Sequence, residues 1–314
     1  MSAATTTLDA RPRAASLFAQ LRLAAADIKL AHSVFALPFA VLAAFLARAP
    51  GAPWGRFAGQ LALIVACMVA ARTWAMLVNR LADRAFDAAN TRTAHRTFAS
   101  GQLSPARGWA FAFAAASLFV GATALFLAIF DNPWPLILSV PALAWIAFYS
   151  YTKRFTPLCH LILGGALAAS PVAAAVAVDP ASLSAAPAVW FIAGMVLVWV
   201  AGFDVIYALQ DRAFDRSAGL RSIPATLGVA GTVWVSRGLH AAAVALLVLA
   251  LRSDARLGVL FAVGIGLVAA LLVLEHAALV RGRREGAGLH PAFFTINGVV
   301  SCTLGALGAA DLLR

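Results

Sequence analysis

Two identical pentapeptides, each with two aspartates, carry the clearest chemical signal in the chain. Residues 83–87 read Asp-Arg-Ala-Phe-Asp, and residues 211–215 repeat them without change. Positions i and i+4 of a helix share one face, so each copy directs two carboxylates the same way, where they repel unless a cation lies between them. Two such pairs at the ends of apolar helices predict a site for hard divalent cations. The alternative is two solvated helix ends paired with nearby arginines, but the verbatim repeat favours the metal site.

Further polar residues extend the first copy toward the preceding apolar run. Asn79, Asp83 and Asp87 are spaced four apart and would form one polar stripe on a helix. Arg72 lies seven residues before Asn79, two turns deeper on roughly the same face. An arginine within an apolar run is costly, and its guanidinium can bind an anion through two hydrogen bonds. Arg72 is therefore an anion-binding candidate, with a snorkelling or helix-bridging role as the alternative.

The second copy and the segment between the copies add further candidates. Asp204 precedes Asp211 by two turns within an apolar run, and an intramembrane carboxylate is a functional candidate by default. Between the repeats, Tyr149 is followed by Lys153 and Arg154. These two cations either signal topology or hold a phosphate group.

Paired carboxylates beside cationic side chains suit Mg²⁺ and a diphosphate. Mg²⁺ is usually held by one or two carboxylates together with substrate phosphates. The sequence has no glycine-rich nucleotide fingerprint, no HExxH motif and no Cys/His cluster. With these motifs within apolar runs, the pattern predicts a lipid diphosphate whose tail lies in the bilayer.

The composition requires that membrane helices position these residues. The 314 residues are 62% hydrophobic and 12% charged, whereas soluble domains have about 45–50% apolar and about 25% charged residues. The net charge of +11 is spread in short clusters between apolar runs, which argues against nucleic-acid binding. Cys67, Cys159 and Cys302 have no metal-ligand spacing, and no removable signal peptide is recognised.

Counting apolar runs of about 20 residues predicts an all-α polytopic membrane protein, one domain over residues 1–314 with a flexible cytoplasmic tail over about 1–20. The nine expected spans cover 28–48, 58–82, 107–128, 134–152, 158–178, 188–211, 230–251, 256–280 and 291–312. With the N-terminus in the cytoplasm, most basic residues lie inside, as the positive-inside rule requires. The exceptions outside are Arg48, Arg56, Arg252, Arg256 and Arg314. Both pentapeptides then end same-direction helices at the cytoplasmic face, as in a parallel repeat.

Taken together, these motifs resemble the UbiA superfamily of intramembrane prenyltransferases over nearly the whole chain. The resemblance rests on Asn79-x₃-Asp83-x₃-Asp87, on Asp204-x₂-Tyr207-x₃-Asp211-x₃-Asp215, on Tyr149-x₃-Lys153, on Arg92-Thr93-x₂-Arg96 and on Ser100-Gly101. It implies nine transmembrane helices around a central cavity, Mg²⁺ and a polyprenyl diphosphate donor. The segment 28–40 resembles the branch of 4-hydroxybenzoate polyprenyltransferase-like enzymes in the bacterial inner membrane.

For individual residues, the resemblance implies two Mg²⁺ sites. Asn79, Asp83 and Asp87 would bind one ion, and Asp211 and Asp215, with Asp204, would bind the other. Substrate contacts are expected from Lys29, Arg72, Tyr149, Lys153, Arg154 and Tyr207. The metals and cations would neutralise the departing diphosphate. Candidates to stabilise the allylic cation are Phe35, Trp74, Tyr149 and Tyr207, with core packing as the alternative for each. His32 and Asp204 are candidates to accept the ring proton, with a local hydrogen-bonding role as the alternative for His32.

The acceptor and the protein class each have alternatives. We expect 4-hydroxybenzoate, in ubiquinone-type biosynthesis, and the alternative is 1,4-dihydroxy-6-naphthoate, in the futalosine route to menaquinone. Arg80 stands where well-known 4-hydroxybenzoate enzymes carry Asp, which affects the choice of acceptor rather than the chemistry. A transporter would explain charges within spans and a parallel repeat, but not two acidic pairs beside diphosphate-binding cations. A CDP-alcohol phosphotransferase would need an aspartate signature that is absent, and a soluble terpene synthase would lack spans.

Overall fold

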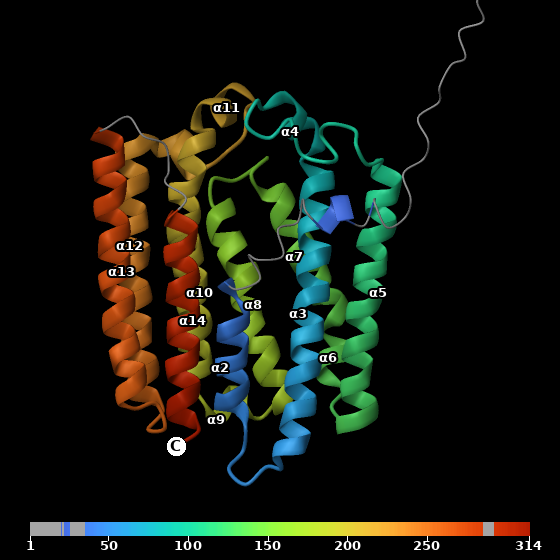
Figure 1. Cartoon of the computed structure of the whole chain (residues 1–314), viewed down its shortest axis with the longest axis vertical. Coiled ribbons are helices and arrows are strands. Elements are labelled where there is room, and N and C mark those ends of the chain that lie inside the picture. Colours follow the sequence, from blue (N-terminus) through green and yellow to red (C-terminus); the bar gives the residue numbers. More distant parts are fainter. Residues whose placement is uncertain (1–19, 21, 26–34, 285–291) are drawn as a thin grey trace, which may run out of the picture.

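The computed structural model is a helical bundle, with no strand in residues 20, 22–25, 35–284 and 292–314, the part of the chain that it describes (Figure 1). The long helices run side by side, and the short ones lie near the two ends of the bundle. The elements are α2 (Leu37–Ala47), α3 (Trp54–Ala82), α4 (Arg84–Ala89), α5 (Pro105–Phe130), α6 (Trp134–Ile137), α7 (Ser139–Thr152), α8 (Cys159–Val178), α9 (Ser182–Ala185), α10 (Ala188–Tyr207), η2 (Ala208–Asp211), α11 (Arg212–Ser217), α12 (Ile223–Ser253), α13 (Val259–Arg284) and α14 (Ala292–Leu312).

The predicted all-α membrane architecture is confirmed, but the count of nine spans is not. Within the described residues, seven helices are long and apolar enough to cross a membrane. The span expected over 28–48 is described only from Phe35, and α2 has 11 residues. The span expected over 134–152 is divided into α6 and α7 at Leu138. Pro141 explains that break, because it lacks an N–H and its ring clashes with the carbonyl four residues earlier, on Ile137, where α6 ends.

Burial differs sharply between the helices. In the apolar stretch of α10, 67% of the residues are buried, whereas α3 and α5 bury 22%. An apolar helix that is buried all round lies in a core, and α10 packs Trp199 against Phe39 and Phe203 there. The apolar but exposed faces of α3 and α5 need a lipid surround. The chain is therefore an integral membrane protein with α10 at its centre.

Small residues let the inner helices approach one another closely. A Cβ at Gly164 of α8 would lie 2.2 Å from the backbone oxygen of Leu197 in α10. Real Cβ atoms do not come so close to a backbone oxygen, so only glycine fits between these two helices. This contact fixes the spacing of α8 and α10, both of which supply side chains to the site described next.

Candidate active site

Both pentapeptides lie where a long helix breaks, and both breaks are at the same end of the bundle (Figure 1). Asp83 separates α3 from α4 with φ −89° and ψ 1°. Asp211 ends η2, just before α11, with φ −99° and ψ 0°. These angles lie in the sparsely allowed bridge region, where many active-site residues occur. The helix expected to carry Asn79, Asp83 and Asp87 as one polar stripe therefore breaks at its middle member, although all three side chains still line one cavity.

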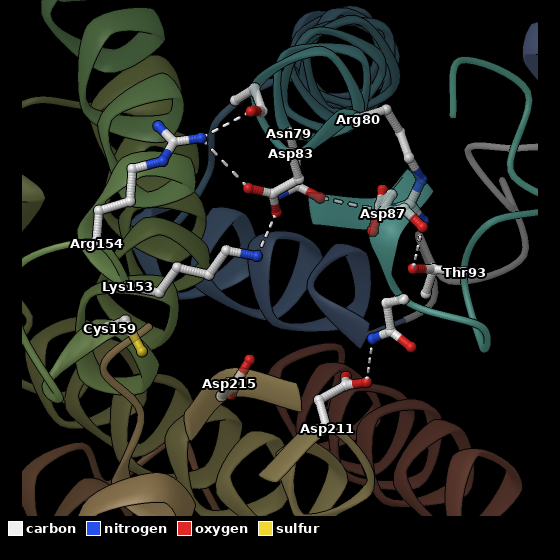
Figure 2. Close-up of polar contacts among 12 residues, drawn as sticks. Asn79, Arg80, Asp83, Asp87, Thr93, Lys153, Arg154, Cys159, Asp211 and Asp215 are labelled. Atoms are coloured by element: carbon white, nitrogen blue, oxygen red, sulfur yellow. Dashed lines mark hydrogen bonds and ion pairs between the residues drawn. The ribbon is translucent and has the colours of Figure 1, made fainter. Parts of the chain in front are cut away.

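The two breaks line one cavity of about 860 Å³. Figure 2 shows Asp83 and Asp87 on one side of the opening and Asp211 and Asp215 on the other. The predicted convergence of the two copies is confirmed. The charged side chains that line the cavity are Arg80, Asp83, Asp87, Arg92, Arg96, Lys153, Asp204, Asp211 and Asp215.

Cations hold the carboxylates of the first copy. Lys153 Nζ donates a hydrogen bond to Asp83 Oδ2 at 2.7 Å, and Arg154 Nη2 lies 3.5 Å from Asp83 Oδ1. Arg96 Nη1 donates to Asp87 Oδ1 at 2.7 Å. Burial raises the pKa of the Asp83 carboxyl above its ordinary value, although Lys153 and Arg154 oppose that rise. Any additional positive charge near this buried carboxylate would stabilise its ionised form further.

The loop after α4 reaches across to the second copy. Arg92 grips Asp211 with two nitrogens, Nε at 2.9 Å from Oδ1 and Nη2 on Oδ2, and Asn90 Nδ2 donates to Oδ1 at 3.0 Å. Burial would lower the pKa of Arg92, but the hydrogen bonds and charge of Asp211 raise it above its ordinary value. Asp215 accepts a hydrogen bond from Ser222 Oγ at 2.8 Å. The two halves of the chain are therefore joined through their acidic motifs.

Asp204 has a partner that sequence reasoning missed. His160 Nδ1 lies 2.6 Å from Asp204 Oδ2, and the backbone N–H of Ile223 donates to His160 Nε2 at 3.4 Å. Since Nε2 accepts a hydrogen bond, the ring proton lies on Nδ1 and faces the carboxylate. Both side chains line the cavity, with His160 buried and Asp204 partly open to it. The sequence showed only a histidine in an apolar run, with no spacing to the acidic motifs.

The other predicted residues fall into three groups. Tyr149, Lys153 and Tyr207 line the cavity, and Arg154 reaches its wall through Asp83. Arg72 does not line the cavity but lies within electrostatic range of Tyr149 and Arg80, which do, and its Nε is buried without a hydrogen-bond partner. Lys29 and His32 lie outside the described residues.

Aromatic side chains were only partly anticipated. Phe35 packs on Trp199 and Phe203, and Trp74 Nε1 donates a hydrogen bond to the carbonyl of Leu143. Neither aromatic side chain lines the cavity. The phenylalanines of the two pentapeptides line it instead, at positions 86 and 214. The centre of the Phe86 ring lies 5.8 Å from Lys153 Nζ and 5.6 Å from the Arg154 guanidinium carbon, within cation–π range.

The donor set fits Mg²⁺ but is not a closed cage. Carboxylate and amide oxygens of two facing helix breaks are the ligands that hard cations prefer. In the described part of the chain, no three His, Cys, Asp or Glu side chains are grouped closely enough to hold a metal by themselves. Mg²⁺ typically takes one or two carboxylates and completes its shell with water and substrate phosphate.

Comparisons with known proteins agree with this geometry. A model of the UbiA prenyltransferase family matches residues 36–297. A 4-hydroxybenzoate octaprenyltransferase of Azotobacter vinelandii is 32% identical over 54% of this chain and 55% of that protein, so this chain matches little more than half of that relative. The corresponding enzyme of Ectopseudomonas mendocina is 30% identical over 77% of this chain and 78% of that protein.

Solved structures extend the likeness to the whole bundle. The apo structure of a UbiA homolog from Aeropyrum pernix K1 has a TM-score of 0.78 and 34% identity, covering 90% of this chain and 98% of that one. A UbiA homolog from Archaeoglobus fulgidus, bound to GPP and Mg²⁺, shares the fold with a TM-score of 0.67 at 20% identity, over 93% of this chain and 100% of that one. This chain belongs to the UbiA prenyltransferase family.

Proposed function

We propose that this protein transfers a polyprenyl group from a polyprenyl diphosphate to a small aromatic acid, with 4-hydroxybenzoate as the preferred acceptor. The observation that carries the proposal is the single cavity in which two aspartate pairs face each other among four cations. Such a cavity suits a diphosphate, and its place at the end of apolar helices suits a substrate with a lipid tail. The 4-hydroxybenzoate octaprenyltransferases among the relatives support this choice of acceptor.

Two sets of oxygen ligands would hold Mg²⁺, and they come from facing helix breaks. Asn79, Asp83 and Asp87 form one set, and Asp211 and Asp215 form the other. Bound Mg²⁺ would neutralise negative charge on the diphosphate as the carbon–oxygen bond of the donor breaks. The resemblance grouped Asp204 with the second set, but we propose that Asp204 accepts the ring proton instead of binding Mg²⁺.

The cations of the cavity would bind the diphosphate. In the structure Lys153, Arg92 and Arg96 neutralise the carboxylates of the two motifs. An incoming diphosphate offers these side chains stronger anionic partners, and guanidinium groups bind phosphate through paired hydrogen bonds. The same residues would thus neutralise the acidic motifs and bind the leaving group.

The reaction exchanges a carbon–oxygen bond for a carbon–carbon bond. The diphosphate leaves with the bonding electron pair, the aromatic ring attacks the allylic carbon, and the attacked ring carbon then loses its proton. Tyr149 and Tyr207 line the cavity and would face the cation-like carbon. We propose that Asp204 accepts this proton, because its side chain lines the cavity and is partly exposed there, and His160 Nδ1 is hydrogen-bonded to its Oδ2.

The choice of acceptor can be tested directly. Purified protein is supplied with one polyprenyl diphosphate and either 4-hydroxybenzoate or 1,4-dihydroxy-6-naphthoate, and kcat/KM is compared on one preparation. We expect 4-hydroxybenzoate to be preferred. A strong preference for the naphthoate would replace this acceptor and leave the reaction type in place.

We also propose that the protein lies in the bacterial cytoplasmic membrane with the cavity on the cytoplasmic side, as its basic loops favour. Ser100 is exposed in the loop beside the cavity, so labelling at this position shows on which face of the membrane the loop lies. In a cysteine-free background, Ser100→Cys should react with a membrane-impermeant thiol reagent only from the cytoplasmic face. Labelling of intact cells from outside would invert the topology.

A further inference from the structure

A second cavity lies at the opposite end of the bundle from the reaction cavity. It measures about 430 Å³ and is lined by the α2–α3 loop and by the adjoining ends of α3, α5, α6 and α8. These ends lie away from α4 and α11, which carry the acidic motifs (Figure 1). Cavities of about 300–1,000 Å³ hold small ligands, and nothing in the prenyl-transfer chemistry uses this one.

Four charged side chains line this second cavity without neutralising one another. They are Arg48, Arg56, Asp131 and Asp179. Among the described residues, none of the four lies within the 4.0 Å that would make an ion pair. Asp179 Oδ1 accepts a hydrogen bond from the backbone N–H of Ala181 at 3.0 Å, but no cation neutralises it among the described residues. Two positive and two negative groups at one opening, none of them in an ion pair there, are complementary to a ligand that carries both charges.

Contacts with the protein fix the two arginines but leave their charges uncompensated. The Arg48 guanidinium lies 3.8 Å from the centre of the Trp54 ring, and its Nη2 donates to the carbonyl of Ala52, while its Nε is buried without a hydrogen-bond partner. Arg56 Nη2 donates to the carbonyl of Phe130 at 2.8 Å. An aromatic face and a carbonyl orient a guanidinium, and each arginine keeps further N–H groups for an anion.

Buried amides build the wall behind these charges. Gln60 Nε2 donates to the carbonyl of Val178 at 3.0 Å, and Asn132 Nδ2 donates to that of Val176 at 2.8 Å. Both side chains are buried, with 4% of Gln60 and 7% of Asn132 exposed. These bonds tie α3 and the α5–α6 turn to the end of α8, so the cavity has a fixed polar wall.

Exposed aromatic side chains flank the cavity, as at a membrane interface. Trp54 and Trp134 are exposed beside it, and such tryptophans mark the membrane interface. Ile129 of α5 precedes the lining residue Phe130, Ile137 ends the short helix that begins at the lining residue Trp134, and each isoleucine is more than half exposed. A ligand bound here would have apolar protein surface on which acyl chains can lie, which favours a lipid over a soluble metabolite.

We propose that this cavity binds the headgroup of a zwitterionic phospholipid that carries a primary ammonium, a phosphoethanolamine headgroup. Its phosphate binds Arg48 and Arg56, and its ammonium donates hydrogen bonds to Asp131 and Asp179. An anionic headgroup without the ammonium would leave both carboxylates facing a negative ligand. A trimethylammonium group has no N–H to donate to them, so a choline headgroup binds less tightly.

Native mass spectrometry of the purified full chain in detergent tests the proposal. Dioleoyl phosphatidylethanolamine, phosphatidylcholine and phosphatidylglycerol are titrated separately. We expect the ethanolamine lipid to bind most tightly. Arg56→Gln should weaken it roughly ten- to a hundredfold, the range for losing a hydrogen bond to a charged group. Asp131→Asn should remove the preference for ethanolamine over choline, and Asn tolerates the positive φ of 54° at that position.

The matched control is Arg252→Gln, which removes an exposed arginine at the end of α12 and outside the cavity. It should leave lipid binding unchanged, and thermal stability in detergent checks the folding of every variant. Three results overturn the proposal: equal binding of the three lipids, preference for phosphatidylglycerol, or unchanged ethanolamine-lipid binding by Arg56→Gln.

Discussion

The buried carboxylate of Asp83 offers the sharpest test of the two-metal site. Its side chain is 6% exposed, and Lys153 lies 2.7 Å away. Asp83→Asn keeps the shape of the side chain but removes its charge. The charge removed would otherwise stabilise the bound cation, and two unit charges about 4 Å apart attract each other by about 4 kcal/mol at an effective dielectric constant of about 20. Because about 1.4 kcal/mol is tenfold in rate, we expect kcat to fall roughly a thousandfold.

The assay measures prenylated product against Mg²⁺ concentration, with folding checked by thermal unfolding in detergent. Asp254→Asn is the matched control, because Asp254 is also a carboxylate paired with a cation at 2.7 Å, its partner being Arg256. That pair lies in the turn between α12 and α13, outside the reaction cavity. The control should keep wild-type turnover. Wild-type kcat and Mg²⁺ dependence in a folded Asp83→Asn protein would refute the assignment.

Three further predictions concern the surroundings of the site. Arg72 lies outside the cavity but within electrostatic range of Tyr149 and Arg80, which line it, so Arg72→Leu should raise KM for the negatively charged aromatic acid more than KM for the donor; a rise in the donor KM alone would link it to the diphosphate. His160→Gln, which can still bond Asp204, should keep much more activity than His160→Leu, and equal kcat values would contradict the proposed pairing. Gly164→Ala should destabilise the fold by about 1–3 kcal/mol through overpacking, whereas Gly121→Ala, with open space around its Cβ, should not; thermal unfolding in detergent compares them.

Much of the architecture follows from hydrophobic run length and the repeated pentapeptide. The long apolar runs locate the seven spans. The two acidic motifs end expected spans that differ by an even number and so run in the same direction, which places both motifs at one end of the bundle. Both inferences rest on local chemistry: backbone polar groups in lipid must be satisfied within a helix. The match of Arg92 and Arg96 to the family also pointed to the loop that neutralises Asp211 and Asp87.

What sequence reasoning missed depends on tertiary contacts. A period of four predicts a straight stripe, yet Asp83 and Asp211 sit at helix breaks, which no local propensity around them requires. His160 is far from Asp204 in sequence, and only the close packing of α8 on α10 brings them together. Pro141 was a readable signal that the expected span over 134–152 would break, because proline removes a helical donor.

Coupled formation of two products tests the central claim most directly. Purified protein receives a polyprenyl diphosphate, 4-hydroxybenzoate and Mg²⁺, and diphosphate release is measured beside prenylated aromatic acid. The account predicts one diphosphate for each prenylated product, with neither formed when the donor, the acceptor or Mg²⁺ is omitted. Diphosphate release without any prenylated acceptor from a panel of aromatic acids, or no turnover at all by the folded protein, would contradict it.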